Sequence, residues 1–171
     1  MLLCLVAASA GGVERRLRTE LAEPALRRGW RLAVTLTPTA ALWLDAVGEL
    51  DRLRDLTDLP VRSVGRMPGE RSPYGLADGY LFAPATAASI AKLALGIGDN
   101  QALTQLCEAV GAPGVPVVVH PQASAAQRAH LAFAGHLDVL RAAGVIIADG
   151  PADELWEPLL DLLETPPRRE L

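Results

Sequence analysis

The chain has 171 residues, of which 50% are hydrophobic and 21% charged, with a formal net charge of −4. This composition excludes a disordered chain, and the acidic balance argues against a nucleic-acid partner bound by phosphate neutralisation. The two cysteines exclude a disulfide scaffold and a four-cysteine zinc site, and no apolar run reaches the roughly 18 residues that span a bilayer, so we expect no membrane partner.

Residues 1–10 read MLLCLVAASA, which has the apolar character of a signal peptide but neither its basic start nor its length. We interpret this stretch as a buried strand followed by a turn of small residues. A reducing, cytoplasmic location is the expectation that follows.

Short apolar runs alternate with helical patterns along the chain. Apolar runs typical of buried strands occur at 2–6, 32–36, 61–64, 80–83, 115–119 and 145–148. Helical spacing is found at 13–28, 39–44, 47–56, 87–95, 102–110, 125–143 and 152–163. Three glycines and two prolines predict a loop at 65–75.

This alternation predicts an α/β fold, a three-layer α/β/α sandwich around a Rossmann-like parallel sheet of about six strands. We expect residues 1–165 to form a single domain and residues 166–171 a flexible tail. Ligands of such sheets bind beyond the carboxyl ends of the strands. The residues that follow each strand are therefore the candidate site residues.

Small residues follow the first predicted strand, where the chain reads AASAGG at 7–12. Small side chains let a ligand approach the backbone, and the N–H groups at the start of a helix attract anions. Ser9, which adds a hydroxyl donor, and Ala10 are therefore candidate phosphate contacts. A tight turn in which small residues merely fit explains the same residues, because the GxGxxG fingerprint is absent.

Hydroxyl residues follow the second predicted strand. Thr39 is placed to cap the next helix. Thr37 and Thr39 could equally donate hydrogen bonds to a phosphate. The sequence leaves capping and phosphate binding open.

A third hydroxyl pair lies in the segment APATAAS at 83–89. Pro84 stiffens the turn after the strand, and Thr86 is placed to cap a helix. Thr86 and Ser89 are three residues apart, so both hydroxyls can lie near the first turn of one helix. This pair is a further candidate anion site at a helix start.

His120 comes directly after the apolar run 115–119, at the expected carboxyl end of a strand. An imidazole there suits a catalytic base because it titrates near neutral pH. The open alternative is a histidine that bonds to a neighbouring loop. His130 and His136 lie on a helical pattern and are interpreted as packing or solvated residues. No histidine pair has HExxH spacing, so no metal site is predicted.

The segment 77–100 resembles the flavoprotein superfamily of homo-oligomeric flavin-containing cysteine decarboxylases. That superfamily includes phosphopantothenoylcysteine decarboxylase and the decarboxylases of peptide C-terminal cysteines. Its Pro-Ala-Ser-Ala-Asn-Thr motif reads PATAAS here at 84–89, and its Gly-Ile-x-Asp-Asn motif reads GIGDN at 96–100. The loop RMPGE at 66–70 is similar to that of short actinobacterial-type flavoproteins. The resemblance covers most of residues 2–148.

The resemblance implies an FMN-binding domain that assembles as trimers or larger oligomers. By motif position, the resemblance implies FMN phosphate contacts for Ser9, Thr39, Thr86 and Ser89. It also implies that Ala87 and His120 lie near the ribityl chain or the ring. The full predicted cofactor-binding set is Ser9, Ala10, Thr37, Thr39, Pro84, Ala85, Thr86, Ala87 and Ser89. In the chemistry of this family the flavin oxidises a thiol-bearing carbon before CO2 is lost, so the implied partner is a small-molecule or peptide thiol.

The substrate-handling positions depart from the pattern of the family. The loop histidine of the decarboxylases falls near Glu70, the motif asparagine is Ala88, and the Pro-Ala-Met-Asn clamp reads PQAS at 121–124. Ala88 and Ser124 are then the implied substrate contacts, and His120 and Glu70 the candidate catalytic bases. Two functions follow: an FMN-dependent decarboxylase-like lyase acting on a cysteine-derived thiol, or a non-catalytic or redox-auxiliary FMN-binding protein.

Overall fold

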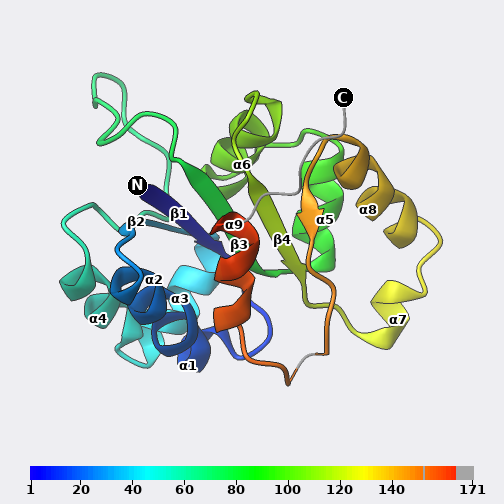
Figure 1. Cartoon of the computed structure of the whole chain (residues 1–171), viewed down its shortest axis with the longest axis horizontal. Coiled ribbons are helices and arrows are strands. Elements are labelled where there is room, and N and C mark those ends of the chain that lie inside the picture. The colour runs from blue at the N-terminus through cyan, green and yellow to red at the C-terminus, as the bar shows by residue number, and fades with distance from the viewer. Residues whose placement is uncertain (152, 165–171) are drawn as a thin grey trace.

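The computed structural model describes residues 1–151 and 153–164, and five parallel strands form its centre (Figure 1). The strands are β1 (Leu2–Ala7), β2 (Arg31–Leu36), β3 (Gly79–Ala85), β4 (Val117–Pro121) and β5 (Ile146–Ile147). Their order is β2-β1-β3-β4-β5, so the chain leaves β1 on one side and returns to pair with it on the other. This reversal makes the carboxyl ends of β1 and β3 the place where a sheet of this type binds ligands.

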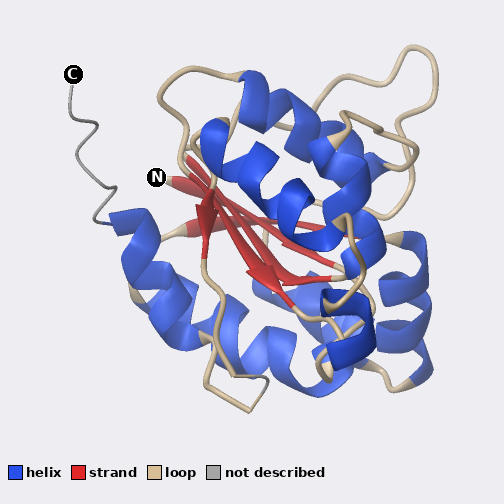
Figure 2. Cartoon of the chain, turned by 90° about the vertical axis from the view of Figure 1, so that its right-hand side faces the viewer, coloured by secondary structure: helices blue, strands red, loops and turns tan. Residues whose placement is uncertain are grey.

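Helices cover both faces of the sheet, which confirms the predicted three-layer fold (Figure 2). One face packs against α1 (Val13–Arg16), the π-helical η1 (Leu17–Ala22), α2 (Glu23–Arg27), α3 (Pro38–Ala46), α4 (Glu49–Leu56), the 3₁₀-helical η2 (Glu157–Leu160) and α9 (Asp161–Glu164). The other face packs against α5 (Ala87–Ala94), α6 (Gln101–Gly111) and α8 (Phe133–Ala142), which the short helix α7 (Ala125–Arg128) precedes.

The core follows from the alternation of side chains along each strand. In β1, Leu3 and Leu5 enter the core on the first face, whereas Cys4 and Val6 enter the core on the second. Both faces of β1 are buried, so the strand reads as a continuous apolar run rather than as an alternating one. Packing on both faces of the sheet therefore fixes the positions of the residues at the carboxyl ends of the strands.

The strand predicted at 61–64 is wrong, and the sheet has five strands rather than about six. Arg62 alone forms an isolated parallel bridge with Thr35 of β2. The chain then turns away as a long loop before β3. The apolar residues that predicted a strand are split between environments, because Val61 is partly buried and Val64 is 71% exposed.

Two predicted helices are interrupted. The pattern 125–143 divides into α7 and α8, and in the turn between them His130 Nδ1 accepts a hydrogen bond from the Ala132 N–H at 3.2 Å. Of the pattern 152–163, residue 152 lies outside the described residues, and within 153–163 the chain is helical only in η2, where Pro158 occupies the first turn, and in α9. The predicted tail at 166–171 lies outside the described residues.

None of the helices in the described part of the chain is both long enough and apolar enough to cross a bilayer.

Candidate functional site

The turns that follow β1, β2, β3 and β4 are joined to one another at the carboxyl edge of the sheet. Backbone hydrogen bonds link them in pairs, so these corners form one continuous surface. The bonds run from the Thr37 N–H to the Ala7 carbonyl (2.9 Å), from the Ala8 N–H to the Pro84 carbonyl (2.9 Å) and from the Gln122 N–H to the Ala85 carbonyl (2.8 Å). The structure therefore brings together the turns that the sequence singled out.

The turn after β1 is closely packed by two distant residues. Gly11 has a φ of +59°, and a Cβ there would lie 3.1 Å from Trp156 Cζ2 and 3.1 Å from Gln122 Oε1. The small residues are thus needed for the packing of this turn. Ser9 and Ala10 are partly exposed, and the Ser9 hydroxyl has no hydrogen bond within the described residues. The turn therefore keeps one free hydroxyl donor at the edge.

We expect Gly11→Ala to destabilise the protein more than Gly48→Ala does. Both glycines have positive φ, +59° and +73°, so each substitution costs about 1–2 kcal/mol of backbone strain. Nothing lies within 4 Å of the added Cβ at Gly48, whereas Gly11 meets two side chains, which adds about 1–3 kcal/mol of overpacking. Urea denaturation of the two variants measures the difference, and equal costs would contradict the close approach.

In the turn after β2, Thr37 rather than Thr39 caps the next helix. The buried Thr37 Oγ1 accepts a hydrogen bond from the Ala40 N–H at 3.4 Å, and Pro38 occupies the first helical position. Proline suits that position because its fixed φ is helical and it lacks the N–H that would be left unpaired. Thr39 is exposed in the first turn of α3. The prediction that Thr39 is placed to cap is therefore wrong, and its hydroxyl lies exposed at the edge.

The turn after β3 carries a pair of linked hydroxyls. Pro84 and Ala85 belong to the end of β3, and Thr86 is the N-cap of α5. The Thr86 hydroxyl accepts the Ser89 N–H at 3.2 Å and donates to Ser89 Oγ at 3.0 Å. The Ser89 O–H proton has no acceptor among the described residues, so this hydroxyl is an available donor at a helix start. Ala87, partly exposed, and Ala88, exposed, complete the first turn.

His120 lies within β4 rather than after it, and both of its ring nitrogens are engaged. Nδ1 is 2.8 Å from the Ala148 carbonyl, and Nε2 is 2.8 Å from the amide nitrogen of Gln122. A carbonyl only accepts and an amide N–H only donates, so the proton sits on Nδ1 and the ring is neutral. Burial lowers the pKa of His120 below its ordinary value, which favours the same state. In this arrangement the imidazole holds Gln122 in place.

We expect His120 to make folding stability depend on pH. Its pKa is lower in the folded than in the unfolded chain, so the unfolded chain binds more protons as the pH falls below about 6.5. Stability is therefore lost as the pH falls from about 6.5 through the lower folded pKa. Unfolding free energies measured between pH 5 and 7 should show a smaller decrease in His120→Gln than in the parent chain. An identical decrease in both would contradict a buried neutral imidazole.

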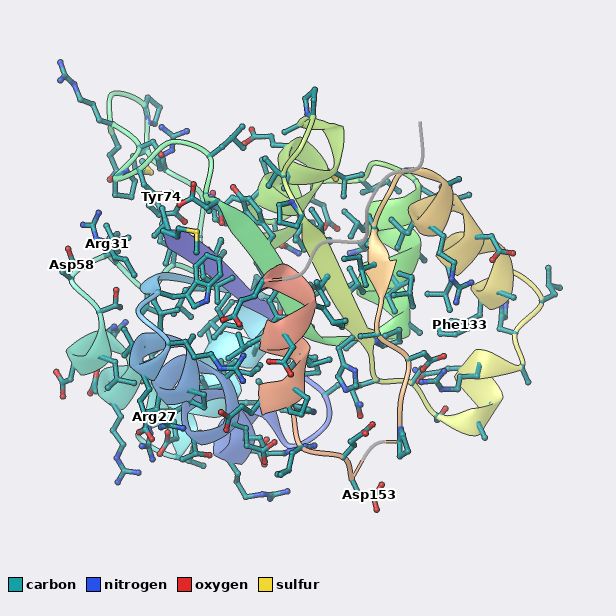
Figure 3. All side chains as sticks on the ribbon, in the orientation of Figure 1. Arg27, Arg31, Asp58, Tyr74, Phe133 and Asp153 are labelled. Carbon is teal, nitrogen blue, oxygen red and sulfur yellow. The ribbon has the colours of Figure 1, made fainter. Side chains whose placement is uncertain are left out.

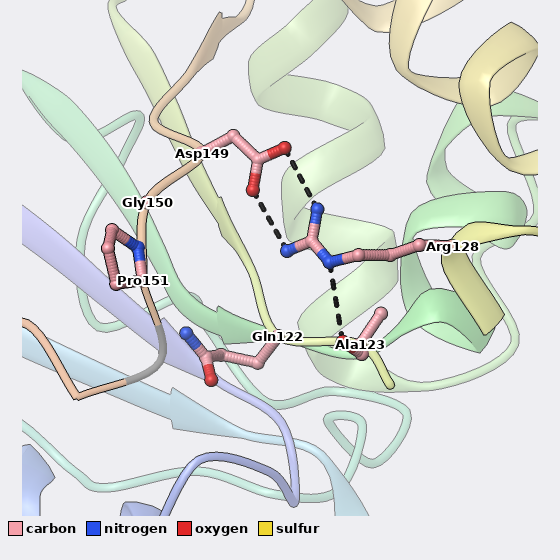
Figure 4. Close-up of a pocket in the computed structure, with 6 residues that line it drawn as sticks. All are labelled: Gln122, Ala123, Arg128, Asp149, Gly150 and Pro151. Carbon is pink, nitrogen blue, oxygen red and sulfur yellow. Dashed lines mark hydrogen bonds and ion pairs between the residues drawn. The ribbon is translucent and has the colours of Figure 1, made fainter. Parts of the chain in front are cut away.

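A cavity of about 420 Å³ opens beside Gln122 between the ends of β4 and β5 (Figure 4). Arg128 and Asp149 form a bidentate ion pair there, with both contacts at 2.9 Å. The Arg128 Nε also donates to the Ala123 carbonyl at 3.3 Å. Ser124 begins α7 with a reciprocal pair of hydrogen bonds to Gln127. This cavity places polar groups next to the joined turns.

The C-terminal segment covers the turns after β1 and β4. Trp156 is fully buried, and its ring lies edge-on to His120 with centroids 6.2 Å apart. Arg16 lies over the indole with its guanidinium carbon 4.1 Å from the ring centroid, and Glu20 accepts the Trp156 backbone N–H at 3.0 Å. Trp156 is thus a structural element of the site that the sequence reasoning missed.

Glu70 is not brought to the joined turns. It lies exposed in the loop before β3, where it accepts the Met67 N–H at 3.0 Å. Figure 1 shows that this loop projects past the amino ends of β1 and β3, away from the carboxyl ends of β3 and β4. Within one copy of the chain, the two candidate bases therefore lie in different places.

The sequence placed Gln122 in the PQAS segment without selecting it as a site residue, and it gave no indication of Arg128 or Asp149. Gln122 had a usable signal, since it follows His120 by two residues at the end of a strand. The ion pair had none, because its partners are 21 residues apart and meet only through the arrangement of β4 and β5. In the described ranges 1–151 and 153–164, no three His, Cys, Asp or Glu residues are placed to hold a metal ion.

Comparison with known proteins finds a matching family and similar solved structures. A model of the family described as Flavoprotein matches residues 9–163. The FMN-dependent cysteine decarboxylase TvaF from thioviridamide biosynthesis is 27% identical, with a TM-score of 0.65 over 96% of this chain and 99% of its own. MrsD from Bacillus sp. HIL-Y85/54728 is 18% identical, with a TM-score of 0.70 over 95% and 92%. The cypemycin decarboxylase CypD is 18% identical, with a TM-score of 0.72 over 95% and 89%. No curated protein sequence matches this chain.

Proposed function

This chain belongs to the Flavoprotein family, and from that membership we propose that it binds FMN at the joined turns and acts as a decarboxylase-like enzyme on a thiol-containing, cysteine-derived substrate. One observation carries the proposal: the turns after β1, β2 and β3 are hydrogen-bonded to one another and present hydroxyl groups at one edge. TvaF, which is described as an FMN-dependent cysteine decarboxylase, matches almost the whole chain and supports the substrate class.

The chemistry of the turns fits a phosphate group. Ser9 and Ser89 offer hydroxyl donors that are not engaged within the described residues, and Thr39 adds an exposed hydroxyl. The first turn of α5 adds backbone N–H groups and the positive end of an eight-residue helix. Each contribution is modest, typically about 0.3–1 kcal/mol for the helix dipole. We therefore infer that the three turns bind the phosphate jointly.

The cavity beside Gln122 is the proposed place for the substrate. A bound flavin would supply the two-electron oxidation of the thiol-bearing substrate that precedes loss of CO2. His120 holds the Gln122 amide, and the Arg128–Asp149 pair fixes the opposite wall. We infer that these contacts orient a substrate and that His120 positions Gln122. Ala88 and Ser124 remain proposed substrate contacts.

The experiment that tests this function combines a spectrum with an assay. The purified protein should be yellow and should release FMN on denaturation. Incubation with cysteine-ended peptides and with 4′-phosphopantothenoylcysteine should give a product that has lost CO2, detected by mass spectrometry. A colourless protein that takes up no added FMN would contradict the proposal.

A second candidate function is an FMN-binding protein without decarboxylase activity. The observation that favours it is the engagement of both His120 ring nitrogens, together with the position of Glu70 away from the turns. This function predicts bound FMN but no CO2 release from any of these thiols. It also predicts that the His120→Ala variant still binds FMN and still supports the function of the protein in cells.

Self-association, as trimers or larger assemblies, is part of the proposal. Apolar side chains on and just after α3 support it, since Leu42 is 69%, Trp43 44% and Val47 52% exposed. Exposed apolar clusters of this kind often mark protein interfaces. Sedimentation at several protein concentrations tests the assembly.

A further inference from the structure

A second pocket, of about 240 Å³, lies between the loop before β3 and helix α6. We call it the loop–α6 pocket. Its α6 wall is a polar stripe with helical spacing, formed by Gln101, Thr104, Gln105 and Glu108. Its loop wall includes Arg62, Arg66 and Tyr74. None of these residues has a part in the proposed flavin site.

Two positive charges in this pocket are poorly neutralised. The Arg62 side chain is only 14% exposed, and its ion pair within the described residues is with Glu70 at 3.8 Å, beyond hydrogen-bond distance. Arg66 donates to a neutral backbone carbonyl, that of Glu70, at 3.4 Å. A largely buried guanidinium normally has closer acceptors for its five N–H donors. Within the described residues, neither arginine therefore has a carboxylate acceptor within hydrogen-bond distance.

Glu108 does not fill this role. Gly65, which precedes Arg66, lies beside Gln101 at the start of α6, where a Cβ on Gly65 would be 3.9 Å from Gln101 Oε1. Glu108 is seven residues further along the helix, which corresponds to roughly 10 Å along its axis. Glu108 forms no ion pair with Arg62 or Arg66 in the described part of the chain.

The wall of the pocket is a fixed polar network. The Thr35 hydroxyl donates to Gln105 Oε1 at 2.6 Å, and Gln105 Nε2 donates to the Tyr74 hydroxyl at 2.9 Å. The Tyr74 hydroxyl is also 3.9 Å from the buried Cys4 Sγ. Figure 3 shows Tyr74 at the base of the loop, next to β1. Burial raises the pKa of Tyr74, so its hydroxyl stays protonated at neutral pH and can act as a donor.

We propose that the loop–α6 pocket binds a small molecule through a carboxylate or phosphate group held by Arg62 and Arg66, with Tyr74 as a further hydrogen-bond donor. Guanidinium groups suit both oxyanions because their N–H donors form parallel bonds with them. The pocket volume suits a ligand smaller than a flavin. Glu108 would accept a donor group at the other end of such a molecule.

The Arg62 end of the pocket is close to the carboxyl end of β2. The Leu36 N–H donates to the Arg62 carbonyl at 2.7 Å, and Thr37 of the flavin site follows directly. The ligand is therefore either the anionic part of a substrate that reaches the edge or a separate small anion. Both sources share the same oxyanion chemistry.

The test is a titration of the purified, flavin-loaded protein with inorganic phosphate and, separately, with acetate, against sodium chloride at equal ionic strength. We expect saturable binding of at least one probe, followed by calorimetry or chemical shifts. Arg62→Gln and Arg66→Gln should each weaken it at least about tenfold, since a hydrogen bond to a charged group contributes about 1.5–3 kcal/mol. Arg71→Gln is the matched control, because Arg71 is exposed on the same loop and does not line the pocket.

If Arg62→Gln does not fold, Arg66→Gln alone tests the site, because Arg66 is exposed and its substitution should not disturb the fold. Equal affinities in Arg66→Gln and Arg71→Gln, or no saturable binding of either probe, would overturn the site. Phosphate binding that is lost in Ser89→Ala but kept in Arg66→Gln would place the anion at the flavin turns and also overturn it. FMN content, measured by absorbance in the same samples, reports separately on the proposed function.

Discussion

Replacing Trp156 with alanine is expected to lower the free energy of unfolding by about 3–5 kcal/mol. The indole is fully buried against the Gly11 turn, His120 and the Arg16 guanidinium, so its removal leaves a cavity between the C-terminal segment and these turns. For a chain of this length the loss corresponds to a decrease in Tm of roughly 10 °C. Urea denaturation followed by circular dichroism measures the free energy directly.

Two variants define the cause of this loss. Trp43→Ala is the matched control, because Trp43 is 44% exposed and its removal should cost much less. Trp156→Phe keeps most of the ring and removes the Nε1 donor, which is the one buried side-chain polar atom without a partner among the described residues. Trp156→Phe should therefore cost far less than Trp156→Ala. Equal costs would contradict the packing of the buried ring as the cause of the loss.

Ser89→Ala is expected to weaken FMN binding at least about tenfold. The Ser89 hydroxyl proton is the available donor at the start of α5, and a hydrogen bond to a charged phosphate contributes about 1.5–3 kcal/mol. Fluorescence quenching of added FMN measures the dissociation constant. The fold should remain intact, because the Thr86 hydroxyl keeps its cap bond to the backbone N–H of residue 89.

Thr19→Ala is a control for the loss of a hydroxyl as such. Thr19 is exposed on η1, where its hydroxyl donates to the Arg15 carbonyl at 3.3 Å, and it takes no part in the joined turns. Its substitution should leave FMN affinity unchanged. If Ser89→Ala and Thr19→Ala bind FMN equally well, the phosphate is not held at the start of α5.

The sequence was informative wherever local pattern and tertiary environment agree. The apolar run at the start of β1 is buried on both faces, and its burial produces the continuous run that predicted a strand. The turns at Ser9, Thr37 and Thr86 could be located because parallel strands align their carboxyl ends at one edge of a sheet. Rules of this kind need no knowledge of long-range contacts.

The features that escaped prediction depend on partners far apart in the chain. Trp156 reads as an isolated aromatic until the C-terminal segment is placed over Gly11. Arg128 and Asp149 reveal their pairing only once β4 and β5 are adjacent. The break between α7 and α8 lies inside a continuous helical pattern, so periodicity does not detect it. Sequence patterns therefore located the turns at the carboxyl edge, but not the distant residues that pack against them.

The edges of the sheet restrict how this protein can associate with other chains. On one side β5 has two residues, and on the other the Arg62 bridge occupies part of the outer edge of β2. Short or covered outer strands leave few unpaired backbone groups for an incoming strand, which protects against fibre-like aggregation. Contacts between copies must then be made by helices and loops, so an assembly can form or change without disturbing the hydrogen bonds of the sheet.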